Sequence, residues 1–261
     1  MKGTRERVRA AAGIVRSLAL YRGRPRHHAG LLALYRPFVR PGDLVFDIGA
    51  HVGDRVRAFR ALGARVVAVE PQPALARLLR LLHGRDPGVV VEELAVGGSE
   101  GTARLRLNLA NPSVATLSAD FVAAARDADG WREQRWDAEA DIALTTLDAL
   151  IARHGMPAFV KIDAEGFEPG ILASLSRPPP ALSFEVTAIA RETGLAALDR
   201  AAALGYTRFR LSLGESHRLA PGGWRDAAAM RATIAALDAA ANSGDIYALL
   251  PATRLAGPVP E

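Results

Sequence analysis

From residue 43 onward, short runs rich in β-branched residues alternate with stretches whose apolar residues recur at helical spacing. This alternation predicts a mostly parallel β-sheet with helices on both faces, because each crossover helix must pack on the sheet between successive strands. We expect the last two strands to form a hairpin-like pair at one edge. The predicted strands are 43–47, 65–70, 89–94, 158–163, 181–186, 206–211 and 245–250.

Helical periodicity fills the gaps between these strands. Gly63 and Gly84 each follow the last periodic residue of a stretch, which is typical of a helix C-terminus. Residues 108–140 interrupt the alternation of strands and helices, since they are polar and show no obvious strand. Such an insertion covers a substrate site in some proteins and is surface decoration in others, and both interpretations stay open. The predicted helices are 56–64, 73–84, 192–205 and 225–241.

Positive charge is concentrated in the first 28 residues. They hold eight basic residues against Glu6 alone, although the net charge of the whole chain is only +5. The remainder is therefore slightly acidic, and the sequence does not indicate a nucleic-acid-binding surface. We expect residues 1–40 to be an N-terminal helical extension whose apolar stripe, including Val8 and Val15, packs on the domain. Weak peripheral contact with an acidic surface is the alternative.

Composition limits the chemistry and the class of protein. The chain has 261 residues, of which 49% are hydrophobic, enough for one large domain over 41–261. Cysteine is absent, which excludes disulfides, thiolate-bound zinc and cysteine nucleophiles. No apolar run reaches the roughly 18–20 residues that cross a bilayer, and no apolar signal core precedes the domain. We therefore expect a cytoplasmic protein.

The segment DLVFDIGAHVGD predicts a ligand site after the first strand. The strand ends at Asp47, the chain turns through Gly49, Ala50, His51 and Gly53, and a helix follows. Glycine lets the backbone turn tightly and approach a ligand closely, and ligands bind such sheets at the carboxyl ends of the strands. The glycines are spaced G-x-x-x-G, which differs from the dinucleotide fingerprint G-x-G-x-x-G.

Two carboxylates distinguish between the possible nucleoside ligands. Glu70, followed by Pro71, ends the second strand, where its oxygens can accept hydrogen bonds from both ribose hydroxyls. Asp47 would repel a pyrophosphate but attract an ammonium group. S-adenosylmethionine carries an ammonium and a sulfonium and no phosphate, so we expect it as the cofactor rather than NAD. Near the end of the third strand, Glu93 and Ala95 are candidates for contacts with the adenine. The alternative is that they belong to an ordinary strand end followed by a turn.

A second acidic segment follows the fourth predicted strand. In AFVKIDAEGFEPGIL, Asp163, Glu165 and Glu168 crowd the strand end, with Lys161 as a nearby partner. Like charges this close must be offset by a cation, a hydrogen-bond network or shifted protonation. A divalent ion held by Asp163, Glu165 or Glu185 is an alternative way to offset these charges, but no clear further ligand is evident and we assign no metal.

At this point the sequence resembles a known family. FDIGAHVGD, VVAVEPQP, LAVGGSEG, TTLDALI, VKIDAEGFEPGIL and LSFEV occur in this order over roughly residues 43–187, as in FkbM-type methyltransferases. The resemblance implies a Rossmann-like class I methyltransferase fold with a seven-stranded sheet. It also implies S-adenosylmethionine as donor and a hydroxyl of a sugar, polyketide or other secondary metabolite as acceptor.

Residue by residue, the resemblance assigns Asp47, Gly49 and Gly53 to the donor loop and Glu70 to the ribose. It places Asp163 and Glu165 near the transfer site, and Asp163 is also expected to contact S-adenosylmethionine. His51 stands where the family typically shows Asn, and Phe167 replaces a small residue. These departures leave the role of His51 open and change the expected acceptor pocket.

Methylation of an alcohol requires a group that takes the hydroxyl proton. The candidate catalytic residues are Asp163, Glu165 and His51. The alternative for His51 is a turn residue that hydrogen-bonds the backbone. The other five histidines are scattered, and we expect them at the surface. Two other functions remain open: an NAD-dependent oxidoreductase or epimerase of the same architecture, and a non-catalytic nucleoside-binding protein.

Overall fold

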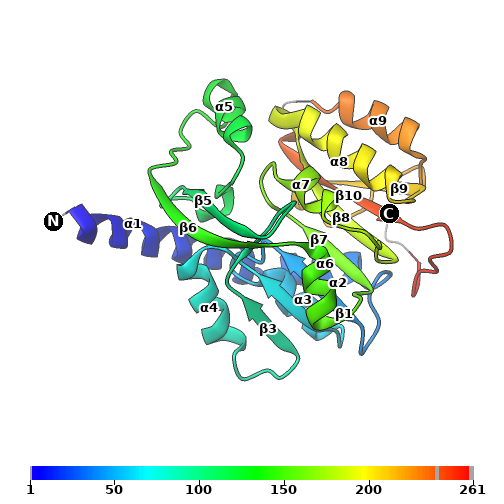
Figure 1. Ribbon diagram of the computed structural model, residues 1–261, viewed down its shortest axis with the longest axis horizontal. Coiled ribbons are helices and arrows are strands. Elements are labelled where there is room, and N and C mark those ends of the chain that lie inside the picture. The colour runs from blue at the N-terminus through cyan, green and yellow to red at the C-terminus, as the bar shows by residue number, and fades with distance from the viewer. Residues whose placement is uncertain (1, 239–240, 259–261) are drawn as a thin grey trace.

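The computed structural model describes residues 2–238 and 241–258, and its centre is a seven-stranded sheet (Figure 1). The strand order is β3-β2-β1-β7-β8-β10-β9. All pairings in this sheet are parallel except those of β10, which runs antiparallel to both neighbours. The strands are β1 (Leu44–Ile48), β2 (Arg65–Val69), β3 (Val89–Glu92), β7 (Phe159–Ile162), β8 (Ala181–Thr187), β9 (Arg208–Leu213) and β10 (Ser243–Leu249).

All seven strands predicted from the sequence are present in the main sheet, including the edge pair β9 and β10. Alternating side chains on each strand explain how the sheet holds two layers of helices. Leu44 and Phe46 pack into one core, while Val45 between them packs into the core on the opposite face. The predicted α/β fold with a mostly parallel sheet is therefore confirmed.

Helices cover both faces of the sheet. The first core lies under α6 (Leu147–His154), α7 (Glu168–Ala173), α8 (Arg191–Ala203) and α9 (Ala227–Ala235). The second core lies under α2 (Pro25–Tyr35), α3 (Asp54–Ala61) and α4 (Pro73–His83). Every helix predicted from periodicity is present, with different boundaries. The largest difference is in α9, which ends at Ala235 rather than at 241, and residues 239–240 of that prediction lie outside the described residues.

A small second sheet was missed from the sequence. Its strands, in the order β4-β6-β5, are β4 (Ala95–Val96), β6 (Ala138–Thr145) and β5 (Gly101–Leu107). β5 and β6 form a long antiparallel pair to one side of the main sheet (Figure 1). Between them lie η2 (Pro112–Val114) and α5 (Ala119–Asp127), so the segment 108–140 has a helix and the start of a strand.

The chain before the first strand is helical, with α1 (Lys2–Ser17), η1 (Leu18–Arg22) and α2, and α1 leads away from the sheet (Figure 1). The expected packing stripe was wrong, because Val8 and Val15 are exposed. Gly13 faces the insertion instead, where a Cβ would lie 2.6 Å from the carbonyl oxygen of Leu109. Among the described helices, none has the length and apolar character that a bilayer crossing requires.

The remaining short helices join the elements around the edge of the sheet. η3 (Ala188–Ala190) leads from β8 into α8. η4 (Gly214–Ser216) follows β9 and lies on the same side of the molecule as the N-terminal helices, since His217 packs against Gly30 of α2.

Candidate functional site

A cavity of about 460 Å³ opens at the carboxyl ends of β1, β2, β7 and β8. From β1 the chain proceeds outward to β2 and β3, whereas β7 and β8 extend the sheet in the other direction, so the cavity lies at the switch in strand order. Seven of the residues predicted from the sequence line it: Gly49, His51, Glu70, Pro71, Ala95, Asp163 and Glu165.

The turn after β1 depends on Gly49. Its φ is +83°, and a Cβ at this position would lie 1.9 Å from the carbonyl oxygen of Asp163. No side chain fits at that distance, so only glycine allows the ends of β1 and β7 to approach this closely. Gly53, with φ +73°, ends the same turn, and its carbonyl oxygen accepts a hydrogen bond from Arg22 at 2.7 Å.

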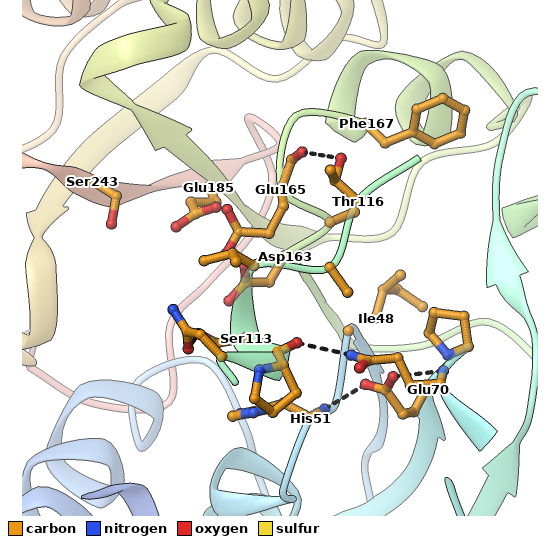
Figure 2. Close-up of a pocket in the computed structure, with 18 of the residues that line it drawn as sticks. Ile48, His51, Glu70, Ser113, Thr116, Asp163, Glu165, Phe167, Glu185 and Ser243 are labelled. Carbon is orange, nitrogen blue, oxygen red and sulfur yellow. Dashed lines mark hydrogen bonds between the residues drawn. The ribbon is translucent and has the colours of Figure 1, made fainter. Parts of the chain in front are cut away.

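Glu70 is fixed by backbone donors at the end of β2. One carboxylate oxygen accepts a hydrogen bond from the backbone nitrogen of His51 and the other from that of Gln72, both at 2.8 Å (Figure 2). Each oxygen keeps a second lone pair, and the residue lines the cavity. Burial raises the pKa of Glu70 to about 7, against the backbone hydrogen bonds that lower it.

His51 has a left-handed backbone with φ +50°, which is uncommon for a residue with a side chain. Its ring meets Tyr21 edge to face at a centroid distance of 5.4 Å. The buried Nε2 atom makes no hydrogen bond with any described residue. Burial lowers the pKa of His51 to about 4, so the imidazole is neutral at pH 7 and retains a lone pair.

Asp47 does not line the cavity. It is fully buried behind the turn, and within residues 2–238 and 241–258 neither carboxylate oxygen has a hydrogen-bond partner. Burial raises its pKa to about 7. Three other predicted cofactor residues also lie off the cavity wall: Ala50 and Gly53 belong to the turn behind it, and the Glu93 side chain pairs with Arg80.

Lys161 joins two carboxylates inside the sheet. Its fully buried ammonium lies 3.1 Å from an oxygen of Asp163 and 2.8 Å from an oxygen of Asp245. Although burial opposes ionisation, the charges of Lys161 and Arg55 hold the pKa of Asp163 below its ordinary value. The sequence indicated the pairing of Lys161 with Asp163 but gave no signal for Asp245, which reaches the site from the reversed strand β10.

Glu165 and Glu185 share the cavity wall with Asp163, and their carboxylates point toward one another (Figure 2). Burial, together with the neighbouring negative charges, raises the pKa of both glutamates well above the ordinary value. One ligand atom from each of the three lies within 4.8 Å of the others. The raised pKa of the two glutamates and the ion pair of Asp163 with Lys161 both reduce the repulsion among the three carboxyl groups.

Glu168 has a different role from the other acids of the segment. Its carboxylate accepts hydrogen bonds from the backbone nitrogens of Ala164 and Gly166, at 2.9 and 3.1 Å, and so orders the loop before α7. Glu165 within this loop has φ +49°, and its carbonyl oxygen accepts a hydrogen bond from Thr116 at 2.7 Å.

The insertion and the N-terminal helices complete the cavity wall, which the sequence did not specify. Periodicity gives no signal for these contacts, because they join segments far apart along the chain. Arg55 and Glu215 also line the cavity. The insertion contributes Asn111–Leu117, Trp131 and Gln134, and the N-terminal helices contribute Arg16, Leu20 and Tyr21.

Two solved structures to which the chain is similar are described as methyltransferases. The O-methyltransferase from Bacillus cereus in complex with SAH is 15% identical, with 93% of this chain and 87% of that chain covered and a TM-score of 0.45. Precorrin-6y C5,15-methyltransferase from Geobacter metallireducens is 11% identical, with 85% and 87% covered and a TM-score of 0.45. A comparison with curated proteins gave no match.

The family described as the methyltransferase FkbM domain matches residues 47–239, which is most of the chain. This match confirms the resemblance seen in the segments around Asp47, Glu70 and Asp163. It also confirms S-adenosylmethionine as the cofactor expected from the sequence. The protein, with its seven-stranded class I sheet and acid-lined cavity, belongs to the FkbM family of S-adenosylmethionine-dependent methyltransferases.

Proposed function

We propose that this enzyme transfers a methyl group to a hydroxyl of a small molecule, such as a sugar, a polyketide or another secondary metabolite, in the cytoplasm. The observation that carries the proposal is the arrangement of carboxyl groups along one cavity. Glu70 lies on the β2 side, and Asp163, Glu165 and Glu185 lie on the side of β7 and β8. S-adenosylmethionine supplies the methyl group when it is bound.

The β2 side fits the nucleoside part of the cofactor. Glu70 is oriented by two backbone donors and keeps free lone pairs for ribose hydroxyls. Gly49 keeps side-chain atoms away from the floor of the cavity, and Pro71 and Ala95 add apolar surface beside it. Asp47 acts from behind the turn, where a positively charged ligand in the cavity favours its ionised form over the protonated one.

The β7 side fits an alcohol. Asp163 is held ionised by Lys161 and serves as the acceptor for the hydroxyl proton. Burial and the neighbouring negative charges raise the pKa of Glu165 and Glu185 well above the ordinary value, which favours the protonated carboxyl that can donate a hydrogen bond to the acceptor molecule. His51, whose neutral ring has an unbonded Nε2 within the described structure, is the second proton acceptor.

The insertion supports a small acceptor rather than a polymer. Val114, Trp131 and Phe121 form a small apolar core of their own beside the cavity, which keeps this part of the wall in place. The indole nitrogen of Trp136 donates a hydrogen bond to the carbonyl oxygen of Val114 at 2.8 Å. A wall closed by such packing excludes water from the reacting groups, which methyl transfer requires.

The cofactor and the reaction are tested separately. Mass spectrometry of the purified protein is expected to detect copurifying S-adenosylmethionine or S-adenosylhomocysteine; copurifying NAD would instead support the oxidoreductase. Incubation with S-adenosylmethionine and a panel of sugars and polyketide alcohols is expected to yield an O-methylated product. Cofactor binding without any product across amine, carbon and alcohol acceptors would support the non-catalytic alternative.

A further inference from the structure

Outside the acid-lined group, two histidines and a glutamate meet between the N-terminal helices and the loop after β9. His27 lies in α2, and Glu215 and His217 lie in and after η4. The His27 Nδ1 atom is 3.0 Å from the His217 Nε2 atom. An oxygen of Glu215 lies 3.7 Å from the first nitrogen and 3.5 Å from the second.

These separations, 3.0–3.7 Å, are close to those of a tetrahedral zinc site. Zinc binds histidine nitrogen and carboxylate oxygen at about 2.0–2.2 Å, so neighbouring ligand atoms in a tetrahedron lie about 3.3–3.6 Å apart. One ligand atom from each of His27, Glu215 and His217 lies within 4.8 Å of the others. Three protein ligands leave one coordination position for water.

An acidic partner already orients the first histidine. The His27 Nε2 atom lies 2.8 Å from an oxygen of Asp54, and both side chains are almost fully buried. A carboxylate on one ring nitrogen fixes the tautomer that leaves the other nitrogen as a lone-pair donor, and ligating histidines in metal sites typically have such a partner. The lone pair of His27 Nδ1 then faces His217 and Glu215.

The charges around the cluster favour a cation. Glu215 turns one oxygen toward the two histidines and the other toward Arg55, at 3.9 Å. The two negative charges of Asp54 and Glu215 together exceed the single positive charge of Arg55.

We propose that His27, Glu215 and His217 bind a divalent transition-metal ion of the zinc type, with Asp54 orienting His27. Binding replaces the hydrogen bond between the two rings, and the His217 proton moves from Nε2 to Nδ1 by exchange with solvent, so the ligating ring stays neutral. The ion joins α2 to η4, and Asp54 links it to the start of α3, directly after the donor turn. Glu215 also lines the cavity, but none of the three ligands is among the groups assigned to methyl transfer, and the inference does not depend on the proposed acceptor.

The full chain, freed of metal with EDTA, is titrated with Zn²⁺ by calorimetry and with Co²⁺ by visible absorption. One ion per chain is expected, with the strong visible bands of tetrahedral Co²⁺. Glu215→Gln, at a half-exposed position that tolerates substitution, should weaken binding at least tenfold, and His217→Ala should abolish it. Asp54→Asn should weaken binding about 10- to 100-fold, as loss of an orienting partner does.

Two control variants make the assignment specific. His28→Ala, on the same helix but outside the cluster, should leave affinity and stoichiometry unchanged. Glu185→Gln should also leave them unchanged, because that carboxylate belongs to the other acidic group. Zn²⁺ should raise the Tm of the wild type and of His28→Ala but not of Glu215→Gln. Absence of stoichiometric binding to the wild type, or loss in Glu185→Gln but not in His217→Ala, would overturn the proposal.

Discussion

The buried ammonium of Lys161 lies 3.1 Å from a carboxylate oxygen of Asp163, so an ion pair inside the sheet controls the protonation of a group on the cavity wall. Asp245 contacts the same ammonium at 2.8 Å from the reversed strand β10. One cation thus contacts two carboxylates. The strength of this arrangement determines whether Asp163 is ionised when it meets an acceptor.

Lys161→Met is expected to destabilise the protein by about 3–5 kcal/mol, because removal of one partner leaves buried charge uncompensated. It should also raise the pKa of Asp163, so the acidic limb of the turnover–pH profile moves to higher pH. Urea unfolding and turnover across pH measure the two effects. Asp245→Asn, which keeps the pair with Asp163, should move the acidic limb less; equal profiles in all three proteins would contradict the assignment.

Gly49→Ala tests the close approach of β1 and β7. The new Cβ would lie 1.9 Å from the carbonyl oxygen of Asp163, so the strand ends must separate. Gly42→Ala is a matched control, since Gly42 has a similar φ of +87° with no atom within 4 Å of its Cβ position. Backbone strain alone costs about 1–3 kcal/mol. Thermal unfolding should show a distinctly larger loss for Gly49→Ala, together with weaker donor binding.

Glu70→Ala should lower the affinity for S-adenosylmethionine about 10- to 100-fold, because hydrogen bonds to a charged group contribute about 1.5–3 kcal/mol. Calorimetry with the folded variant measures the change. Glu93→Ala serves as the control, since that side chain pairs with Arg80 away from the cavity wall. Undiminished affinity in Glu70→Ala would remove the ribose role from this residue.

Asp163→Asn should reduce acceptor turnover about 100-fold or more with the donor saturating, in the range of a lost general base. The affinity for S-adenosylmethionine should change much less, because Glu70 and the Gly49 turn remain. Single-turnover kinetics separates the two steps. His51→Gln is compared in parallel; if it abolishes turnover while Asp163→Asn keeps normal turnover, the imidazole is the proton acceptor.

Asp47 makes the stability of the ligand-free protein depend on pH. Its pKa is about 7 when folded and 3.8 when unfolded, so between these values the folded state holds the additional proton. Stability is therefore complete at low pH and falls as pH rises from about 4 to about 7. In Asp47→Asn, the decrease in the free energy of unfolding over this pH range should be smaller by up to about 4 kcal/mol. Denaturant unfolding at pH 5 and pH 8 measures it; identical pH dependence in both proteins would contradict the raised pKa.

The sequence identified some residues of the cavity wall and wrongly assigned others to it. Glu70 and Asp163 were identified because an acid at the end of a buried strand stands out against the apolar residues before it. Glu93 follows a strand in the same way, yet its side chain pairs with Arg80 instead. Strand position alone does not determine where a side chain points once a neighbouring cation competes for it.

The histidines show a second limit of sequence reasoning. All five outside the donor turn were expected at the surface because nothing along the chain links them. His27 and His217 are instead mostly buried and meet across a separation of 190 residues. Their contact depends on α2 and η4 packing on the same side of the sheet, and no local pattern encodes that arrangement.

By itself, the sequence determined the seven strands, their covering helices and the acids at the strand ends, because apolar periodicity and strand termini are local properties of the chain. Tertiary structure alone decided that Asp245 would share Lys161 with Asp163, and that the insertion and N-terminal helices would complete the cavity. The antiparallel pairing of β5 and β6 was also visible only in the tertiary structure, since few side chains of these strands are buried. Such contacts bring together residues far apart in the chain, and their energy depends on burial that exists only in the folded protein.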